Sequence, residues 1–84
     1  MRKRHVDTLE AIFAHPVRAG VRWSDIEALI AALGGEIEER AGSRVAVILN
    51  GRVSVFHRPH PRPETDKGAL RKIREFLESA GVKP

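Results

Sequence analysis

The sequence predicts a single α+β domain, residues 1–84, in the order helix, helix, three antiparallel strands, helix, with one sheet packed against the helices. Three observations support this fold class. An apolar stripe at helical spacing follows Ser24 and ends at Gly34-Gly35. Two valine-rich runs flank Asn50-Gly51, a dipeptide typical of a two-residue hairpin loop. A proline-rich connector then leads to a last stripe at helical spacing, which ends at Gly81.

Length and composition limit the classes of protein to which the chain can belong. Its 84 residues suffice for one small core, and the absence of cysteine excludes disulfides and thiolate metal sites. No apolar run approaches the roughly 20 residues of a membrane span. Charged residues, not an apolar signal-peptide core, follow the basic residues 2–4. We therefore expect a cytoplasmic protein with no membrane partner.

The net charge of +4 is unevenly distributed along the chain. Residues 5–39 contain two arginines against seven acids, a balance of −5. Residues 40–74 contain nine lysines or arginines against two acids, a balance of +7. The basic half suits an anionic partner, of which nucleic acid is the commonest. The alternative is a solvated surface whose asymmetry arose by chance.

The first helix is expected around residues 6–13, with Asp7 or Thr8 as its cap, and it stops at His15-Pro16. Its apolar positions are Leu9, Ile12 and Phe13.

The second helix is expected to begin with a capping box, Ser24-Asp25-Ile26-Glu27. In this motif the hydroxyl of Ser24 accepts a hydrogen bond from the Glu27 amide, and the Glu27 side chain reaches back. Trp23, just before the cap, is placed to pack on Ala28 as a hydrophobic staple. The apolar stripe of this helix comprises Ile26, Leu29, Ile30 and Leu33.

A type I′ turn at Asn50-Gly51 determines how the two flanking strands pair. Leu49 then faces Arg52, and the register continues until Arg44 faces His57. One face of this hairpin is expected to cover the helices. It carries Ala46, Ile48, Val53 and Val55, and a turn at Gly42-Ser43 would place Ile37 opposite Ile48 on the same side.

The other face of the hairpin is too apolar for a fully solvated surface, and such patches usually mark an interaction site. We expect it to bind a protein partner or a second copy of the chain. The alternative is that the first helix folds across it. Its apolar residues are Val45, Val47, Leu49 and Phe56, beside Glu36, Glu38, Arg40 and Arg52.

The last helix is expected to be capped by Thr65 or Asp66. Its apolar stripe comprises Leu70, Ile73, Leu77 and Ala80, and its exposed face carries Lys67, Arg71, Lys72 and Arg74.

From Trp23 onward the chain resembles the HicA family of toxins from bacterial type II toxin–antitoxin systems. The matching motifs, in order, are Leu33-Gly34-Gly35, Gly42-Ser43-Arg44, His60-Pro61 and Gly68-Ala69-Leu70-Arg71-Lys72-Ile73. The resemblance implies a double-stranded-RNA-binding-like fold, mRNA cleavage that inhibits translation, and a HicB-type antitoxin. The partner face described above would then be the antitoxin or dimer interface. Residues 1–22 are an extension with no counterpart in the pattern, and they could add a helix, cover the sheet or supply charge to RNA.

The chain departs from the family pattern at the proposed catalytic histidine, which directly follows Gly-Ser in the family and is Arg44 here. Arginine stays protonated in proteins and cannot act as a base, but it can bind phosphate. We therefore expect a shifted catalytic site with His57 as general base or acid, Arg44 as phosphate clamp and His60 as second imidazole. The alternative is that His57 and His60 are simply surface residues at a strand end.

Other cations and polar groups near this end are candidate RNA contacts: Ser43, Arg58, Arg62, Lys67, Arg71 and Lys72. No cofactor is expected. A metal would require His57 and His60 to be joined by Glu64 or Asp66, and this spacing is not typical of a metal site. The chain is thus interpreted as a toxin that binds and cleaves mRNA. The alternatives are a noncatalytic RNA-binding module and a protein-interaction domain. Only the latter predicts little RNA affinity and a weak dependence on salt.

Overall fold

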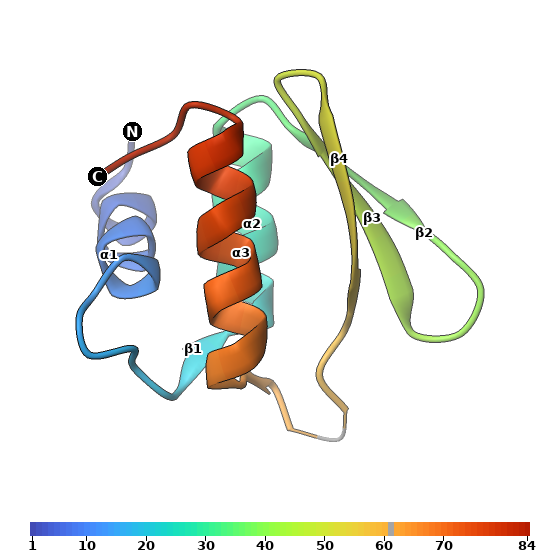
Figure 1. Cartoon of the computed structure of the whole chain (residues 1–84), viewed down its shortest axis with the longest axis horizontal. Helices are drawn as coiled ribbons and strands as arrows, with labels where there is room; N and C mark the ends of the chain where they lie inside the picture. The colour runs from blue at the N-terminus through green and yellow to red at the C-terminus, as the bar shows by residue number, and fades with distance from the viewer. Residues whose placement is uncertain (61) are drawn as a thin grey trace.

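The computed structural model describes residues 1–60 and 62–84 and arranges them in three layers (Figure 1). Helix α1 forms the outer layer, α2 and α3 form the middle layer, and a three-stranded antiparallel sheet covers their other side. The elements are α1 (Lys3–Ile12), β1 (Val21–Arg22), α2 (Trp23–Ala32), β2 (Glu36–Glu39), β3 (Arg44–Leu49), β4 (Arg52–His57), β5 (Glu64–Thr65) and α3 (Lys67–Ser79). None of the described helices has the length and apolar character needed to cross a membrane.

The predicted hairpin register is confirmed. Strands β3 and β4 pair antiparallel from Leu49 opposite Arg52 to Arg44 opposite His57. Asn50 and Gly51 connect them with φ angles of 50° and 78°. Both values lie in the left-handed region that a type I′ turn requires, which is why an Asn-Gly pair forms this turn.

The prediction of which sheet face covers the helices was wrong. Val45, Val47, Leu49 and Phe56, expected to form a partner surface, are at most 3% exposed and belong to the core. Val53 and Val55, expected to face the helices, are 60% and 40% exposed. The structure therefore removes these four core side chains from any antitoxin or dimer surface, and it is α2 and α3, not the first helix, that cover them.

The pairing of β2 also differs by one residue from the prediction. Ile37 lies opposite Val47, and Glu36 lies opposite Ile48. A one-residue change of register moves every side chain of a strand to the other face. Here it lets Ile37 keep its expected place against the core while sharing a face with Val47 and not with Ile48, and it leaves Glu36 and Glu38 on the solvent side. Leaving these carboxylates in water avoids the large cost of burying a charge.

Residues 1–22 add a helix to the core, one of the three roles considered for them. Leu9 and Ile12 are buried, and α1 packs against both α2 and α3. Helix α1 begins at Lys3, about a turn before the expected caps Asp7 and Thr8, and no side chain of the described residues caps it. Arg74 of α3 secures its end by donating to the Ile12 and Ala14 carbonyls at 3.1 and 3.0 Å.

Helix α2 begins at Trp23, so the predicted capping box is wrong. The backbone N–H of Trp23 donates instead to the Pro63 carbonyl at 3.0 Å, and the Glu27 carboxylate accepts the indole N–H of Trp23. The end of the helix was predicted correctly: Gly34 has a φ of 88°, and Gly35 donates to the Ile30 carbonyl at 2.9 Å.

Helix α3 agrees with its prediction. The Asp66 carboxylate accepts the Ala69 amide at 2.8 Å, as an N-cap does. Leu70, Ile73 and Leu77 are fully buried. After the helix, the Val82 amide returns to the Leu77 carbonyl at 2.9 Å around Gly81, whose φ is 82°.

A two-stranded ladder between β1 and β5 was not predicted. It pairs Val21 with Thr65 and Arg22 with Glu64, so the start of α2 and the start of α3 lie at the same end of the molecule. Two-residue strands leave no alternating pattern in a sequence, because two residues do not establish a period.

Candidate nucleic-acid interface

A shallow hollow of about 290 Å³ lies between the end of β4 and the first two turns of α3. It is lined by Phe56, His57, Asp66, Gly68, Ala69 and Lys72. The hairpin register supplies the imidazole, and the Gly68–Ile73 motif supplies the helix wall. Gly68 has no side chain to fill the hollow, and the space above it is open: a Cβ there would meet only the Asp66 carboxylate, at 3.4 Å.

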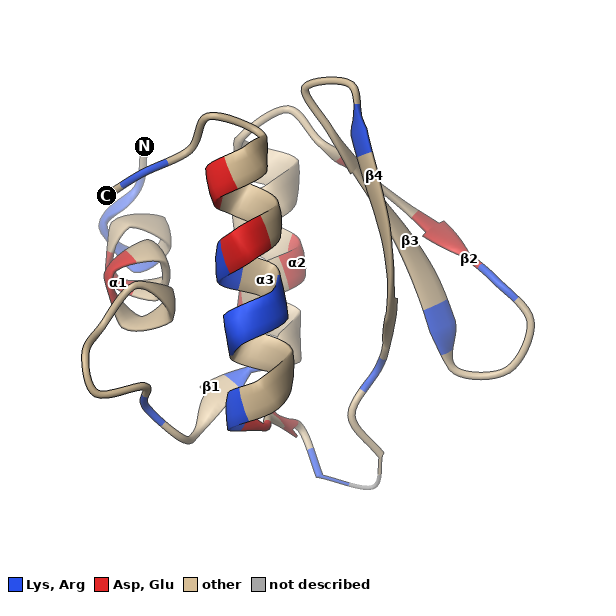
Figure 2. Cartoon of the chain, viewed as in Figure 1, with Lys and Arg blue, Asp and Glu red and all other residues tan. Residues whose placement is uncertain are grey.

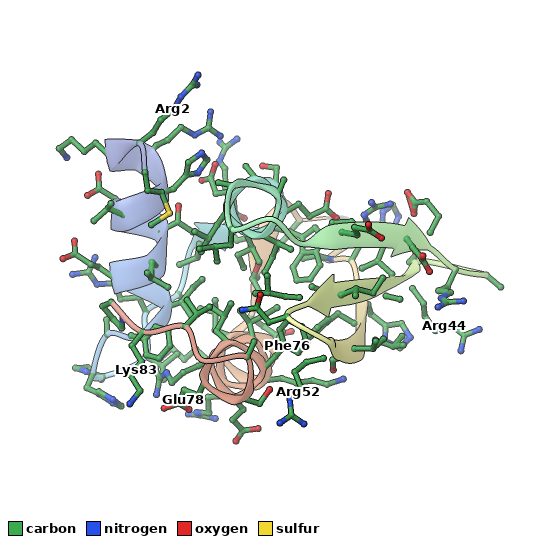
Figure 3. All side chains as sticks on the ribbon, turned by 90° about the horizontal axis from the view of Figure 1, so that it is seen from above. Arg2, Arg44, Arg52, Phe76, Glu78 and Lys83 are labelled. Atoms are coloured by element: carbon green, nitrogen blue, oxygen red, sulfur yellow. The ribbon has the colours of Figure 1, made fainter. Side chains whose placement is uncertain are left out.

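Lys72 bridges α3 and the edge strand β4. Its Nζ donates to the Val55 carbonyl at 2.6 Å and lies 4.8 Å from the centre of the Phe56 ring. The ring in turn packs edge-on against Phe76, with centroids 6.0 Å apart, and Figure 3 shows Phe76 between α3 and the sheet. The buried aromatic pair therefore gives the cation a defined position at the rim of the hollow.

Arg44 and His57 are Cα partners at the exposed end of the β3–β4 hairpin. Both side chains are exposed, and Arg44 is directed away from the helices at the far end of the sheet (Figure 3). Its Nε donates to the Ala41 carbonyl at 3.1 Å, which anchors the base of the guanidinium within its own turn. The terminal nitrogens have no carboxylate within 4.0 Å among the described residues.

His60 does not line this hollow. It is exposed in the connector between β4 and β5, three residues beyond His57. Pro61, which completes the His60-Pro61 motif, lies outside the described residues. The structure therefore brings Arg44 and His57 together by strand pairing, whereas His60 is near them only along the chain.

Arg58 lies in an ion-pair network at the surface. Its Nε is 3.0 Å from the Glu27 carboxylate, and its Nη1 donates to both oxygens of Glu39. Hydrogen bonds to Glu39, and then to Glu27, raise the pKa of Arg58 above its usual value. Because Glu27 also accepts the indole N–H of Trp23, Arg58 ties the end of β4 to the start of α2. Sequence reasoning missed Glu27 in this role, having assigned it to a capping box.

The other predicted RNA contacts differ in their surroundings. Ser43 lies in the turn before β3, where its carbonyl accepts the Arg58 amide at 2.8 Å. The remaining three are exposed cations at the connector and on the first turns of α3: Arg62, Lys67 and Arg71. In the described part of the chain, no group of three or more histidine or carboxylate side chains is placed to hold a metal ion.

The fold and this surface define a small α+β protein in which one exposed imidazole, that of His57, has Arg44 as its strand partner and shares a hollow with Lys72. The family model described as the HicA toxin of bacterial toxin–antitoxin systems matches residues 23–82. The chain therefore belongs to the HicA toxin family, and this membership implies an antitoxin partner. No curated protein and no solved structure gives a significant match.

Proposed function

We propose that this chain is the toxin of a toxin–antitoxin pair and that it binds and cleaves mRNA, which stops translation in the cytoplasm. The observation that supports the proposal best is the pairing of Arg44 with His57 at an exposed hairpin end, where His57 also lines the hollow beside the first turns of α3. This arrangement puts a cation that can bind phosphate beside an imidazole that can exchange a proton, two of the three groups that the reaction below uses.

In the proposed reaction His57 accepts the proton of the ribose 2′-hydroxyl while the 2′-oxygen attacks the adjacent phosphorus. Arg44 binds the phosphate oxygens and stabilises the charge that develops on them. The bond from phosphorus to the 5′-oxygen breaks, and His60 supplies the proton that the leaving oxygen needs. The products are a 2′,3′-cyclic phosphate and a free 5′-hydroxyl. His60 acts in this scheme by approaching from the connector once RNA is bound.

The exposed cations outside the reacting pair hold the rest of the RNA strand. Arg62, Lys67 and Arg71 are directed to solvent, and Lys72 stands at the rim of the hollow. A protein that neutralises phosphates with such groups binds through the backbone, without regard to sequence. We infer that the sheet and α3 act together here as in a double-stranded-RNA-binding-like fold. In this scheme Arg58, held by two carboxylates, contributes stability and not phosphate binding.

The test is induced expression of the wild-type chain and of His57→Ala, with growth and total mRNA followed together. We expect growth arrest and fragmented mRNA from the wild type and neither from the variant. His15→Ala is the matched control, because His15 is also exposed but lies beyond α1. It should remain toxic.

The replacement of the family histidine by Arg44 favours one second candidate, an RNA-binding module that does not cut. Wild-type protein that is folded and binds RNA, yet leaves growth and mRNA intact, would establish this candidate. Cleavage that persists unchanged in His57→Ala would refute the shifted site, although not the toxin function.

A further inference from the structure

A second hollow lies on the opposite side of α2 from the sheet. Its volume is about 380 Å³, and it is bounded by α1, the loop that precedes β1, β1 itself and the start of α2. Its charged lining residues are Arg4, Arg18, Arg22, Asp7 and Asp25. The three arginines all precede residue 23, where the family match begins, so they belong to the extension.

The carboxylates of this hollow are already engaged, and two of its arginines are not. Asp7 accepts a hydrogen bond from Lys3 Nζ at 2.9 Å, and Asp25 lies 3.6 Å from Arg4. Arg18 and Arg22 are exposed, and neither has a carboxylate within 4.0 Å in the described part of the chain. The hollow therefore presents two uncompensated guanidinium groups, which suit the oxygens of a phosphate.

This hollow adjoins the basic start of α3. Arg22 is the Cα partner of Glu64 in the β1–β5 ladder, and Lys67 begins α3 three residues after Glu64. Figure 2 shows blue segments recurring along this end of the molecule, in the loop before β1, in β1, in the β4–β5 connector and at the start of α3. Cations spaced along one end can follow the successive phosphates of a strand.

We propose that the hollow between α1 and α2 is a second phosphate-binding site for RNA, in which Arg18 and Arg22 hold backbone phosphates of the strand that lies on α3. The proposal rests on the RNA-binding function proposed above and extends it to the N-terminal extension. Backbone phosphate is the ligand because the described residues that line the site include three arginines and no aromatic ring for stacking.

The first experiment measures binding of a single-stranded RNA oligonucleotide at several salt concentrations, for the wild type, for R18A/R22A and for R52A/K83A. The last variant is matched because it removes the same charge at two exposed residues that do not line the hollow. Each phosphate contact to single-stranded RNA contributes about 0.7 to the slope of log affinity against log salt, so losing two contacts in R18A/R22A should reduce the magnitude of this slope by about 1.4. The affinity of R18A/R22A at ~0.15 M salt should fall about tenfold. Thermal melts of all three proteins verify the fold.

Three outcomes separate this proposal from the one before it. If the wild type shows no salt-dependent binding of RNA, both the proposed function and this second site are refuted. Wild type that binds, with R18A/R22A equal to R52A/K83A, refutes the second site alone. A loss confined to R18A/R22A, with the slope change, supports it.

A second experiment distinguishes RNA from a small anion as the occupant. The backbone amides of residues 18–25 are followed by NMR during titration with the oligonucleotide and, separately, with inorganic phosphate. Shifts with RNA at concentrations where phosphate has no effect support the proposal. Equal responses to both, or no response to RNA, overturn it.

Discussion

Arg58 and Arg62 are close in the sequence, but their surroundings in the structure differ. Both were predicted to contact RNA, but only Arg58 reaches carboxylates, those of Glu27 and Glu39. The difference depends on the distance between the end of β4 and the start of α2, which cannot be predicted from the local sequence. Arg58 therefore connects three elements, whereas Arg62 remains exposed.

We predict that Arg58→Ala lowers the free energy of unfolding by about 1 kcal/mol, because it leaves Glu27 half-buried with one partner fewer. Its affinity for RNA should stay near that of the wild type. Arg62→Ala should show the reverse, with unchanged stability and weaker RNA binding. Urea denaturation and RNA titration of both variants test this pair. If folded Arg58→Ala binds RNA more weakly than the wild type, Arg58 contacts RNA after all.

Gly35 is a second residue whose identity the packing requires. A Cβ at this position would lie 2.7 Å from Ile30 Cγ2 and 2.8 Å from the Ile48 carbonyl oxygen. The second contact is with backbone, so relief would require β3 to move relative to α2. This close approach lies where the chain passes from α2 to β2.

We predict that Gly35→Ala destabilises the protein by about 1–3 kcal/mol, the usual range for overpacking. Gly68→Ala is the control, since its Cβ would meet only the Asp66 carboxylate, at 3.4 Å, and alanine favours a helix. In thermal denaturation, Gly35→Ala should have a melting temperature below that of the wild type, and Gly68→Ala should not. A Gly35→Ala protein as stable as the wild type would show that the sheet can shift freely.

At the scale of elements, helix α3 joins stability to the proposed function. Its buried stripe holds the middle layer, its start is capped by Asp66, and its first turns line the hollow beside His57. Edge strand β4 is held against it by the bond from Lys72 to the Val55 carbonyl. A change at the start of α3 should therefore alter both stability and RNA binding.

We predict that Asp66→Ala costs about 1 kcal/mol, the usual effect of losing an N-cap. Asp66→Asn keeps an oxygen that accepts the Ala69 amide, so its stability should stay close to that of the wild type. Removing the negative charge beside the bound phosphates should also tighten RNA binding in both variants. Denaturation and RNA titration measure the two effects. Equal destabilisation by Ala and Asn would contradict the role of the side chain as a cap.

At the scale of the whole molecule, the fold gathers cations that are dispersed along the chain. The β1–β5 ladder brings the start of α2 and the start of α3 to one end of the molecule. In the three-stranded sheet, the β3–β4 hairpin places Arg44 opposite His57. Glu36 and Glu38 of β2 lie on the solvent face of the sheet, which by strand register also carries Arg44 and His57, whereas Glu39 pairs with Arg58.

We predict that the affinity for single-stranded RNA falls steeply with salt. Contacts from the four exposed cations Arg62, Lys67, Arg71 and Lys72 alone correspond to a slope of about −3 in a plot of log affinity against log salt. Filter binding over a range of potassium chloride concentrations gives this slope. A slope near zero would favour the protein-interaction alternative.

The parts of the fold that were predicted correctly depend on short-range chemistry. Asn50-Gly51 formed the expected turn, and the β3–β4 register followed from it. Asp66, Gly81 and the stripe between them placed α3. The family pattern agreed as well, although it carries no information about the extension.

The parts that were wrong depend on long-range packing. Both faces of the hairpin carry apolar residues, so its alternation could not tell which face meets the helices. Capping at Ser24 looked favourable locally, but Pro63, far along the chain, supplied the acceptor for Trp23. The candidate site shows the same division: strand pairing predicted Arg44 beside His57, while the positions of Arg58 and Lys72 depended on neighbouring elements.

The sequence by itself determined the fold class, the hairpin register and the start and end of α3, because turns, caps and apolar periodicity act over a few residues. The tertiary structure alone decided which sheet face is buried, that α1 completes the core, and which cations remain unpaired. These outcomes compare the burial of one surface with that of another, and each such comparison involves groups that are distant in the chain.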